Sequence, residues 1–278
     1  GVSSIAGGTG KGDGVRLMTC QIFEGSRSAS DAQNAAAFIY AADNGACIAQ
    51  CSYGNSYALT SDDMYINGGQ FNIDGKEVKV DGSPLENAAL KYFLDPANSN
   101  HQSLEGNIAV FAAGNHRQPY SSYPGALPYV ISVTAFGADS LPGGYTNYGP
   151  GTTISAPGGD QDYYWDYVDE HHNYGEVGCI LSTLPTNVSE SGYGWMEGTS
   201  MACPHVSGVL ALAISHAAEK ALSLTADQLK EALYSTAKPI DNYCVGTKFY
   251  HRYVADIGPL QPMQMDLSLY KSQMGAGQ

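Results

Sequence analysis

The stretch EGTSMACPHVSG, residues 197–208, places a serine and a histidine at the start of an apolar segment that is predicted to be helical. Ser200 could be a helix cap, because a serine oxygen accepts one of the free N–H groups at a helix start. The same place also suits a nucleophile, since the free N–H groups and the helix dipole favour developing negative charge. A nucleophile needs a base, and His205, five residues further on, falls on a different part of the helix. The residues alone leave capping and catalysis open.

Length and composition exclude several classes of protein. The chain has 278 residues, of which 43% are hydrophobic and 14% are charged, a balance typical of globular proteins with a sizeable core. Its formal net charge of −14 argues against nucleic acid and anionic membranes as partners, because both require a basic surface. No run of about 18 apolar residues occurs, so no membrane span is expected. The six cysteines show no metal-ligand spacing, and most of them are expected to be free structural thiols.

Strand-like apolar runs alternate with helical patterns along the chain. Strands are expected over residues 15–23, 46–54, 107–115, 129–137, 152–159 and 179–185. Helices are expected over residues 30–45, 83–94, 201–221 and 225–237. Ser30 is a plausible N-cap, and Thr225 and Gln228 have capping-box spacing. This alternation predicts one α/β domain of three layers, in which a mostly parallel sheet is covered by helices on both faces.

Two segments interrupt this rhythm and are predicted to be insertions within a domain that spans residues 1–278. Residues 55–82 contain GGQFNIDGKEVKV, which predicts a hairpin that turns at Asp74 and Gly75. Residues 159–178 are acidic and aromatic without any period. The carboxylates of this second segment could bind a structural calcium ion, although no ion is expected to be required for the chemistry. The candidate ligands are Asp160, Asp162, Asp166, Asp169 and Glu170.

The pattern GTSMAxPHVxG closely resembles the serine signature of the subtilisin-like serine proteases, the subtilases, at all nine of its specified positions. The resemblance implies that Ser200 is the nucleophile of an acyl-enzyme mechanism and that His205 is structural. IAVFAAGN, residues 108–115, resembles the family segment that ends in the oxyanion-hole asparagine, here Asn115. Its side-chain amide would hold the oxyanion together with the Ser200 backbone N–H. Standing alone, AAGN would indicate only a turn asparagine. The resemblance continues in order through SSYPGALPYVISVTAF, YTNYGPGTTISAPGG and ILSTLP.

The same resemblance implies a set of substrate-binding residues. CSYG resembles the strand end that contacts the substrate backbone, AAG resembles the opposite wall of the S1 pocket, and a later serine lies near its base. The stretch SRSAS resembles an edge strand that pairs with an extended peptide, but it fits a polar loop and helix cap equally well. The implied residues are Ser52, Tyr53, Gly54, Ala112, Ala113, Gly114, Ser122, Ser28, Ala29 and Ser30. Tyr53 replaces a commoner aliphatic residue, which leaves the side-chain preference open.

The chain departs from the family in one respect. Subtilases also have an Asp-[Ser/Thr]-Gly segment and a His-Gly-Thr-His segment, and neither string occurs in these 278 residues. None of the seven histidines has that setting, and His116 beside Asn115 would be a poor substitute. The first residues resemble the region just after the catalytic-histidine helix, and the last resemble a Gly-x-Gly segment that leads into a final strand and helix. We therefore expect a subtilase fragment without its N-terminal elements, which has little or no activity alone because triad members act as a unit.

The leading interpretation is a secreted or cell-envelope serine endopeptidase that acts on protein or peptide substrates. The missing N-terminal part of its own domain would be a partner of this chain. The alternative is a catalytically dead subtilase-like module that binds peptides or other partners. Intact Ser200 and Asn115 favour the enzyme, because a dead enzyme has no need of either side chain.

Overall fold

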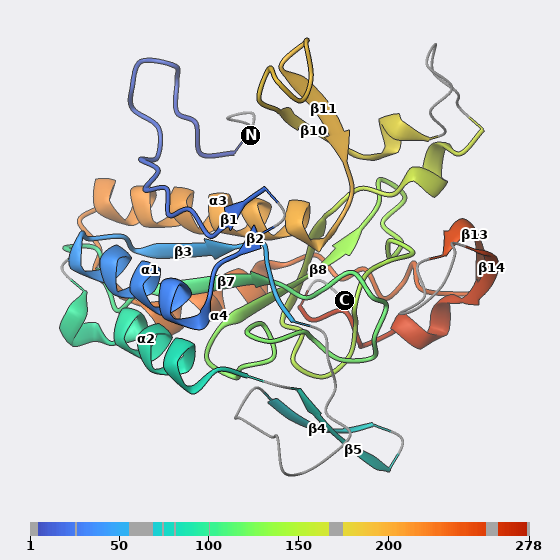
Figure 1. The fold of residues 1–278 in the computed structure, drawn as a ribbon, viewed down its shortest axis with the longest axis horizontal. Coiled ribbons are helices and arrows are strands. Elements are labelled where there is room, and N and C mark those ends of the chain that lie inside the picture. The colour runs from blue at the N-terminus through green and yellow to red at the C-terminus, as the bar shows by residue number, and fades with distance from the viewer. Residues whose placement is uncertain are drawn as a thin grey trace.

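The computed structural model describes residues 5–25, 27–55, 69–73, 75–80, 82–99, 101–166, 175–253 and 261–276. At its centre lies a parallel sheet of four strands in the order β3-β7-β8-β9 (Figure 1). These strands are β3 (Ile48–Cys51), β7 (Ile108–Ala112), β8 (Ile131–Phe136) and β9 (Ile154–Pro157). Each falls within a segment predicted to be a strand.

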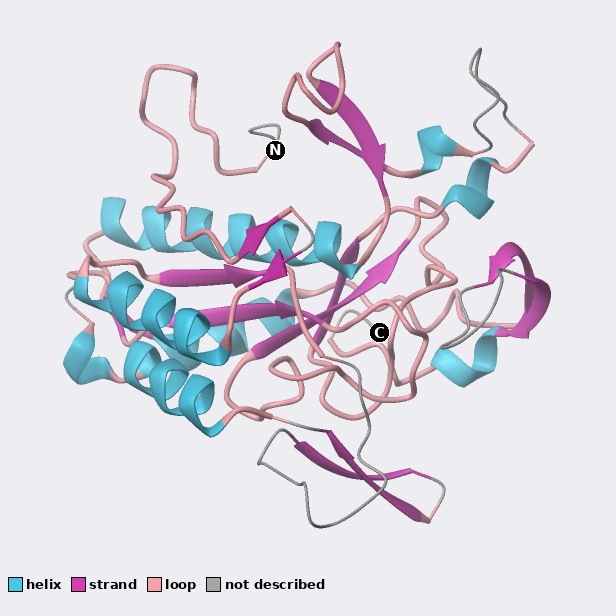
Figure 2. Cartoon of the chain, in the orientation of Figure 1, coloured by secondary structure: helices cyan, strands magenta, loops and turns pink. Residues whose placement is uncertain are grey.

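Two pairs of helices cover the two faces of this sheet (Figure 2). The helices are α1 (Asp31–Asp43) and α2 (Pro84–Leu94) on one face, and α3 (Thr199–Glu219) and α4 (Ala226–Thr236) on the other. Strand β7 shows the division, because its alternate residues enter different cores. Ile108 and Val110 pack with α3 and α4, whereas Ala109 and Phe111 pack with α1 and α2. The predicted three-layer α/β architecture is therefore confirmed.

The predicted helix ends are also present. The Ser30 hydroxyl and backbone N–H both donate to the side-chain oxygen of Gln33 at the start of α1. At the start of α4, Thr225 and Gln228 exchange hydrogen bonds of 2.9 and 3.1 Å in a capping box. Gly45 ends α1 with a φ of +78°, a conformation that favours glycine.

One predicted strand is wrong. Of residues 15–23 only Phe23 is in a strand, the two-residue β1 (Phe23–Glu24), which pairs with β2 (Arg27–Ser28) rather than with the central sheet. Leu17 is 87% exposed, and Cys20 is half-buried. A strand requires a hydrogen-bonded neighbour, and β3 is the last strand at this end of the sheet among the described residues. The segment is apolar, but a strand that could pair with it in the central sheet is not among the described elements.

Several elements lie outside the central sheet. The strand predicted over residues 179–185 is present as β10 (Ile180–Thr183), but it forms an antiparallel hairpin with β11 (Tyr193–Met196) that projects from the molecule (Figure 1). The predicted hairpin in the first insertion is also present, as β4 (Gly69–Ile73) and β5 (Lys76–Val80), although Asp74 lies outside the described residues. The short strands β6 (Leu104–Glu105) and β12 (Leu224–Thr225) pair with each other in parallel.

The second predicted insertion packs against a hairpin that the sequence did not suggest. It contains the 3₁₀ turns η3 (Gln161–Tyr164) and η4 (Glu176–Gly178). The unexpected hairpin joins β13 (Thr247–Tyr253) to β14 (Gln261–Asp266), and the 3₁₀ turn η5 (Leu267–Tyr270) follows it. A further turn, η2 (Pro96–Asn98), follows α2. The assignment of residues 1–278 to one domain with insertions at 55–82 and 159–178 stays a prediction.

No disulfide joins any two of the six cysteines, all of which lie within the described residues. Helix α3 is long and apolar enough to cross a membrane by length and composition alone, contrary to the expectation from the sequence. Its residues Ala202, Val206 and Leu210 are nevertheless buried in the core that α3 shares with the sheet. That packing is typical of the central helix of a layered α/β domain.

Candidate active site

Helix α3 begins one residue before Ser200, so Ser200 is not its N-cap. The cap is Gly198, with a φ of +150° that favours glycine, and Thr199 is the first helical residue. The Ser200 hydroxyl lies 3.4 Å from the backbone oxygen of Ser52. The capping interpretation of Ser200 is therefore wrong, and its hydroxyl is not occupied by the backbone of its own helix.

The side chain of Asn115 supplies the acceptor that the glycine cap lacks. Its Oδ1 accepts hydrogen bonds of 2.8 Å from both the N–H and the hydroxyl of Thr199. Because the N–H can only donate, these contacts fix which end of the amide is the oxygen. The Nδ2 end faces Gly198, where an added Cβ would lie 3.4 Å from it. Asn115 thus presents an amide donor beside the start of α3.

Two donors at the start of α3 have no acceptor among the hydrogen bonds of the described residues. One is Nδ2 of Asn115, and the other is the backbone N–H of Ser200 itself. The neighbouring N–H groups are occupied, since Thr199 donates to Asn115 and Met201 donates to the oxygen of Gly198 at 2.9 Å. Two free donors at a helix N-terminus suit an oxyanion that develops on a substrate carbonyl.

The residue that follows β3 is hydrogen-bonded directly to the start of α3. The Ser52 hydroxyl donates to the backbone oxygen of Ser200 at 2.8 Å and accepts from the side-chain amide of Gln50 at 2.7 Å. One turn further along α3, the buried Cys203 thiol lies 3.3 Å from the backbone oxygen of Val110 on β7. The start of α3 is therefore held at the carboxyl ends of two adjacent parallel strands, where ligand sites of α/β sheets are found.

A buried asparagine that sequence reasoning missed organises the predicted S1 wall. Asn147 is fully buried, and its side chain makes four hydrogen bonds. Its Nδ2 donates to Ala113 O (3.0 Å) and Ser122 Oγ (3.2 Å), and its Oδ1 accepts from the N–H groups of His116 and Gln118 (both 3.0 Å). Gly114 must be glycine here, because its φ is +111° and an added Cβ would lie 2.3 Å from the Ser122 oxygen. Within YTNYGPG, Asn147 resembles an ordinary turn residue, and no sequence signal marked its role.

The structure brings most of the predicted substrate-binding residues together. The N–H of Ser122 donates to the backbone oxygen of Ala113 at 2.8 Å, which joins the two segments of the predicted pocket. Gly54 passes so close to this unit that an added Cβ would lie 2.8 Å from the Tyr123 oxygen. Ala112, at the end of β7, is buried in the central core. These segments therefore converge within one region beside Ser52.

Tyr53 points away from solvent into the layer of α1 and α2. Its hydroxyl donates to a carboxylate oxygen of Glu86 at 2.7 Å, and its ring meets Phe111 edge-on at 5.7 Å. Burial raises the pKa of the Tyr53 phenol and also that of the Glu86 carboxyl. The tyrosine at this position is thus held by a partner on α2.

The remaining predicted segment is not joined to this region by hydrogen bonds among the described residues. Ser28 pairs within the small β1–β2 hairpin, the Ala29 N–H donates to the oxygen of Ile22 at 2.7 Å, and Ser30 caps α1. The helix-cap interpretation therefore describes Ser30. Pairing of this segment with an extended peptide stays a prediction.

No histidine hydrogen-bonds to the Ser200 hydroxyl in the part of the chain that the structure describes. His205 instead contacts the backbone oxygen of Met201 through Nδ1 at 2.8 Å, as expected for a structural residue. The backbone N–H of His116 is bonded to Asn147. The described residues thus supply a hydroxyl and two free hydrogen-bond donors, and no histidine among them is bonded to that hydroxyl.

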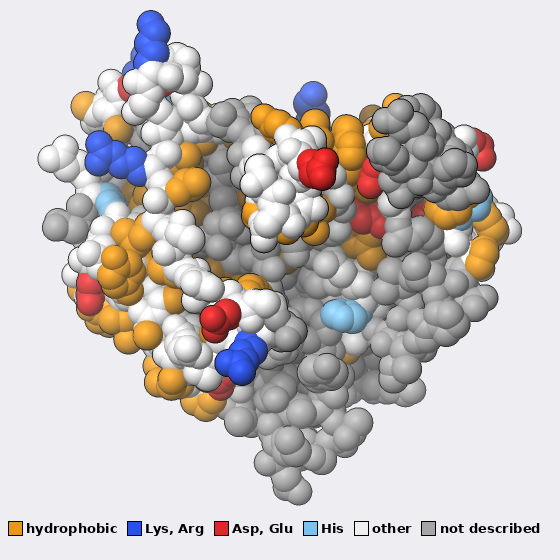
Figure 3. All heavy atoms as spheres, turned by 45° about the horizontal axis from the view of Figure 1, so that its top comes forward, with side chains coloured by type: hydrophobic (Ala, Val, Ile, Leu, Met, Phe, Trp, Pro, Cys, Tyr) orange, Lys and Arg blue, Asp and Glu red, His pale blue; other side chains and the backbone are white. Residues whose placement is uncertain are grey.

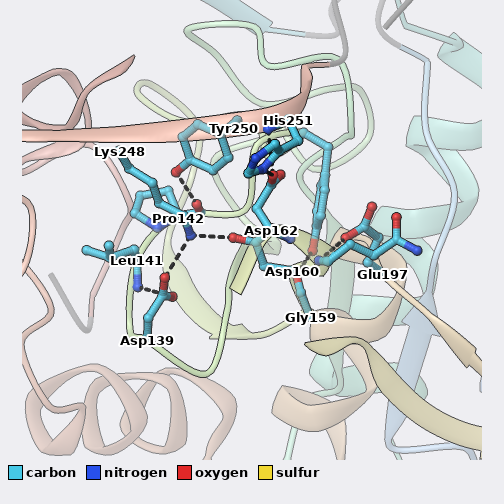
Figure 4. Close-up of polar contacts among 12 residues, drawn as sticks. Asp139, Leu141, Pro142, Gly159, Asp160, Asp162, Glu197, Lys248, Tyr250 and His251 are labelled. Atoms are coloured by element: carbon cyan, nitrogen blue, oxygen red, sulfur yellow. Dashed lines mark hydrogen bonds and ion pairs between the residues drawn. The ribbon is translucent and has the colours of Figure 1, made fainter. Parts of the chain in front are cut away.

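Two of the carboxylates considered for calcium have other partners. Asp160 bonds to the Lys248 ammonium, and Asp162 accepts from both the backbone N–H and the ring of His251 (Figure 4). Two of the other candidates, Asp169 and Glu170, lie outside the described residues. Within the described part of the chain, no group of three or more His, Cys, Asp or Glu side chains is arranged to hold a metal ion. Calcium binding in this segment stays a prediction.

Fold and geometry together define an α/β protein with a serine and two free donors at the N-terminus of its central helix. The chain belongs to the subtilase family of serine proteases, whose family model matches residues 2–260. The thermophilic serine proteinase of Bacillus sp. (strain AK1) is 26% identical over 90% of this chain and 46% of its own length. The extracellular basic protease of Dichelobacter nodosus is 35% identical over 47% of this chain and 19% of its own length. The chain thus spans less than half the length of both relatives.

Solved structures support the fold. A lanthipeptide protease has a TM-score of 0.56 and 22% sequence identity, covering 78% of this chain and 62% of its own. The prenylagaramide maturation protease PagA has a TM-score of 0.55 and 24% identity, covering 78% of this chain and 61% of its own. Both likenesses confirm the expected subtilisin-like fold.

Proposed function

We propose that this chain carries the nucleophile and the oxyanion donors of a serine endopeptidase that hydrolyses peptide bonds through an acyl-enzyme on Ser200. One observation carries the proposal: the free N–H of Ser200 and the free amide of Asn115 lie at the start of one helix, beside an uncapped serine hydroxyl. The word extracellular in the name of the Dichelobacter nodosus relative supports a secreted or cell-envelope location.

The chemistry assigns each group one task. Ser200 Oγ attacks the scissile carbonyl carbon, and the carbonyl oxygen becomes an oxyanion that accepts from Asn115 Nδ2 and the Ser200 N–H. Collapse of this intermediate breaks the C–N bond and releases the amine, which leaves an ester on Ser200. Water then attacks the ester, and the carboxylic acid leaves with the hydroxyl restored. In the first half a base takes the proton from Ser200 Oγ and gives it to the leaving amine, and in the second half it takes a proton from the attacking water and returns it to Ser200 Oγ.

Among the described residues the partner of the Ser200 hydroxyl is the backbone carbonyl of Ser52, a group that does not accept a proton at neutral pH. We propose that polypeptide outside these 278 residues supplies the histidine and the aspartate. The outer edge of β3 offers a place for it, since β3 is an edge strand among the described elements. The nearby N-terminal segment supports the same arrangement.

That segment exposes apolar side chains that a further sheet element would cover. Val15, Leu17 and Met18 are 51%, 87% and 40% exposed in the segment predicted to be a strand. The N-terminal segment lies at the upper left of Figure 1, and Figure 3 shows hydrophobic side chains exposed on that left side of the molecule. Parallel sheets are ordinarily buried on both faces, so a strand paired with β3 would give these side chains an interior.

Cleavage of a peptide library tests the proposal. Residues 1–278 alone are expected to cleave nothing measurable, whereas the full-length protein is expected to cleave peptides and to lose that activity in Ser200→Ala. Ser207→Ala is the matched control, because Ser207 lies on the same helix and its hydroxyl bonds only to its own helix, at Cys203 O. Cleavage by residues 1–278 that disappears in Ser200→Ala would overturn the assignment of the base. Undiminished cleavage by full-length Ser200→Ala would overturn the assignment of Ser200 as the nucleophile. A full-length protein that binds peptides without cleaving them would instead be a binding module.

A further inference from the structure

A buried ion cluster lies between the β13–β14 hairpin and the segment that follows β9. Lys248 on β13 has a side chain that is only 11% exposed, and its Nζ contacts carboxylate oxygens of both Asp139 (2.7 Å) and Asp160 (Figure 4). The Asp160 side chain is 2% exposed. A carboxylate so far from solvent depends on a partner, and Lys248 is the cation that faces it.

Asp160 belongs to a short segment, residues 158–161, that bonds to the residues just before Ser200. The Gly198 N–H donates to the oxygen of Gly158 at 2.9 Å, and the Gln161 N–H donates to the Glu197 carboxylate at 2.8 Å. The fit is close, since an added Cβ on Gly158 would lie 2.8 Å from the oxygen of Gly198. The segment therefore holds the turn that caps α3 at two points.

We propose that Lys248, acting through Asp160, is a positioning residue for Ser200. Lys248 fixes the segment 158–161, that segment fixes Gly198, and the conformation of Gly198 sets the direction of the Ser200 N–H. The inference rests on the proposed function, because its consequence is the placement of an oxyanion donor. It assigns a catalytic purpose to the β13–β14 hairpin, which otherwise lies apart from the site.

The cluster contains its own matched control. Asp139 and Asp160 are bonded alike: in each, Oδ2 contacts Lys248, while Oδ1 accepts from the N–H two residues later, that of Leu141 or Asp162. A change of either aspartate to asparagine therefore removes one negative charge. In both cases a neutral amide then replaces the carboxylate that contacts the Lys248 ammonium. Only Asp160 is covalently part of the segment that bonds to Gly198.

The experiment compares Asp160→Asn with Asp139→Asn in the full-length protein. For hydrolysis of a short peptide substrate, Asp160→Asn is expected to lower kcat about tenfold or more, because small misplacements of catalytic groups cost up to about 100-fold. KM is expected to change by less than about twofold, since the oxyanion donors act in the transition state. Asp139→Asn is expected to lower kcat by less than about threefold, even though both variants remove a carboxylate from the same Lys248 ammonium. Lys248→Met should reproduce Asp160→Asn, and Lys248→Arg should restore most of kcat.

Circular dichroism fixes a temperature at which every variant is folded, so that lost stability is not read as lost turnover. Equal losses of kcat in the two asparagine variants, or no loss in either, would overturn the positioning role. A wild-type protein without any turnover would instead be a failure of the proposed function.

Discussion

Thr199→Val tests how the Asn115 amide is oriented. Thr199 is fully buried, donates its hydroxyl to Asn115 Oδ1 at 2.8 Å and accepts from the Gly114 N–H at 3.2 Å. Valine has nearly the same shape and removes both bonds, while the Thr199 backbone N–H still donates to Asn115. The amide therefore keeps one of its two restraints.

The magnitudes follow from these contacts. The half-buried Gly114 N–H is left without its acceptor, which costs up to about 1–3 kcal/mol of unfolding free energy. Complete loss of an oxyanion donor costs about 10²–10³ in kcat, or about 2.7–4 kcal/mol, a range measured on subtilisin, which is a member of the same family. Loss of half of that free energy corresponds to a decrease in kcat of about 10- to 30-fold.

The assay measures kcat and KM for a peptide substrate of the full-length protein, with unfolding in urea measured in parallel. Thr199→Ser keeps the hydroxyl and is expected to retain kcat within about threefold, whereas Thr199→Val is expected to lose about 10- to 30-fold with KM nearly unchanged. An unchanged kcat in Thr199→Val, in a protein where Asn115→Ala loses at least 100-fold, would show that the Thr199 hydroxyl is not needed to orient the Asn115 amide. The backbone N–H would then suffice to orient the amide.

Two further predictions concern buried polar groups. Asn147→Ala removes the four hydrogen bonds of a fully buried side chain and is expected to lower the unfolding free energy by about 3–5 kcal/mol, as measured by urea denaturation; a loss below about 1 kcal/mol would contradict its organising role. Burial raises the pKa of Asp160 to about 6, from the ordinary value of 3.8, so the folded protein binds this proton more tightly than the unfolded chain. As the pH rises from about 4 to 6, wild-type protein should therefore lose about 2–3 kcal/mol of stability relative to Asp160→Asn, and a difference that stays level or grows would contradict the assignment.

Much of the fold follows from local patterns in the sequence. The alternation in β7 and the capping residues Ser30 and Thr225 depend on nearby residues, and the structure has them where the patterns predict. The segment over 15–23 shows the limit of such patterns. An apolar run can be read from the sequence, but whether it becomes a strand depends on a neighbour that the run does not specify.

The candidate site could be predicted in part. Ser200 and Asn115 stand in recognisable motifs, yet the sequence left open whether Ser200 caps its helix, a question that the contact of Asn115 with Thr199 answers. Asn147 and Lys248 carried no signal, because their roles arise from contacts between distant parts of the chain. Lys248 meets Asp160 across 88 residues of sequence, a separation at which no periodicity or spacing is informative.

A covalent adduct on Ser200 would show most directly that this residue is the nucleophile. Full-length protein treated with a fluorophosphonate should gain one phosphonyl group as fluoride leaves, and peptide mapping by mass spectrometry should place that group on Ser200. Asn115→Ala should label far more slowly, because the phosphonyl oxygen uses the same two donors. An adduct on another residue, or none in a protein that cleaves peptides, would contradict the claim.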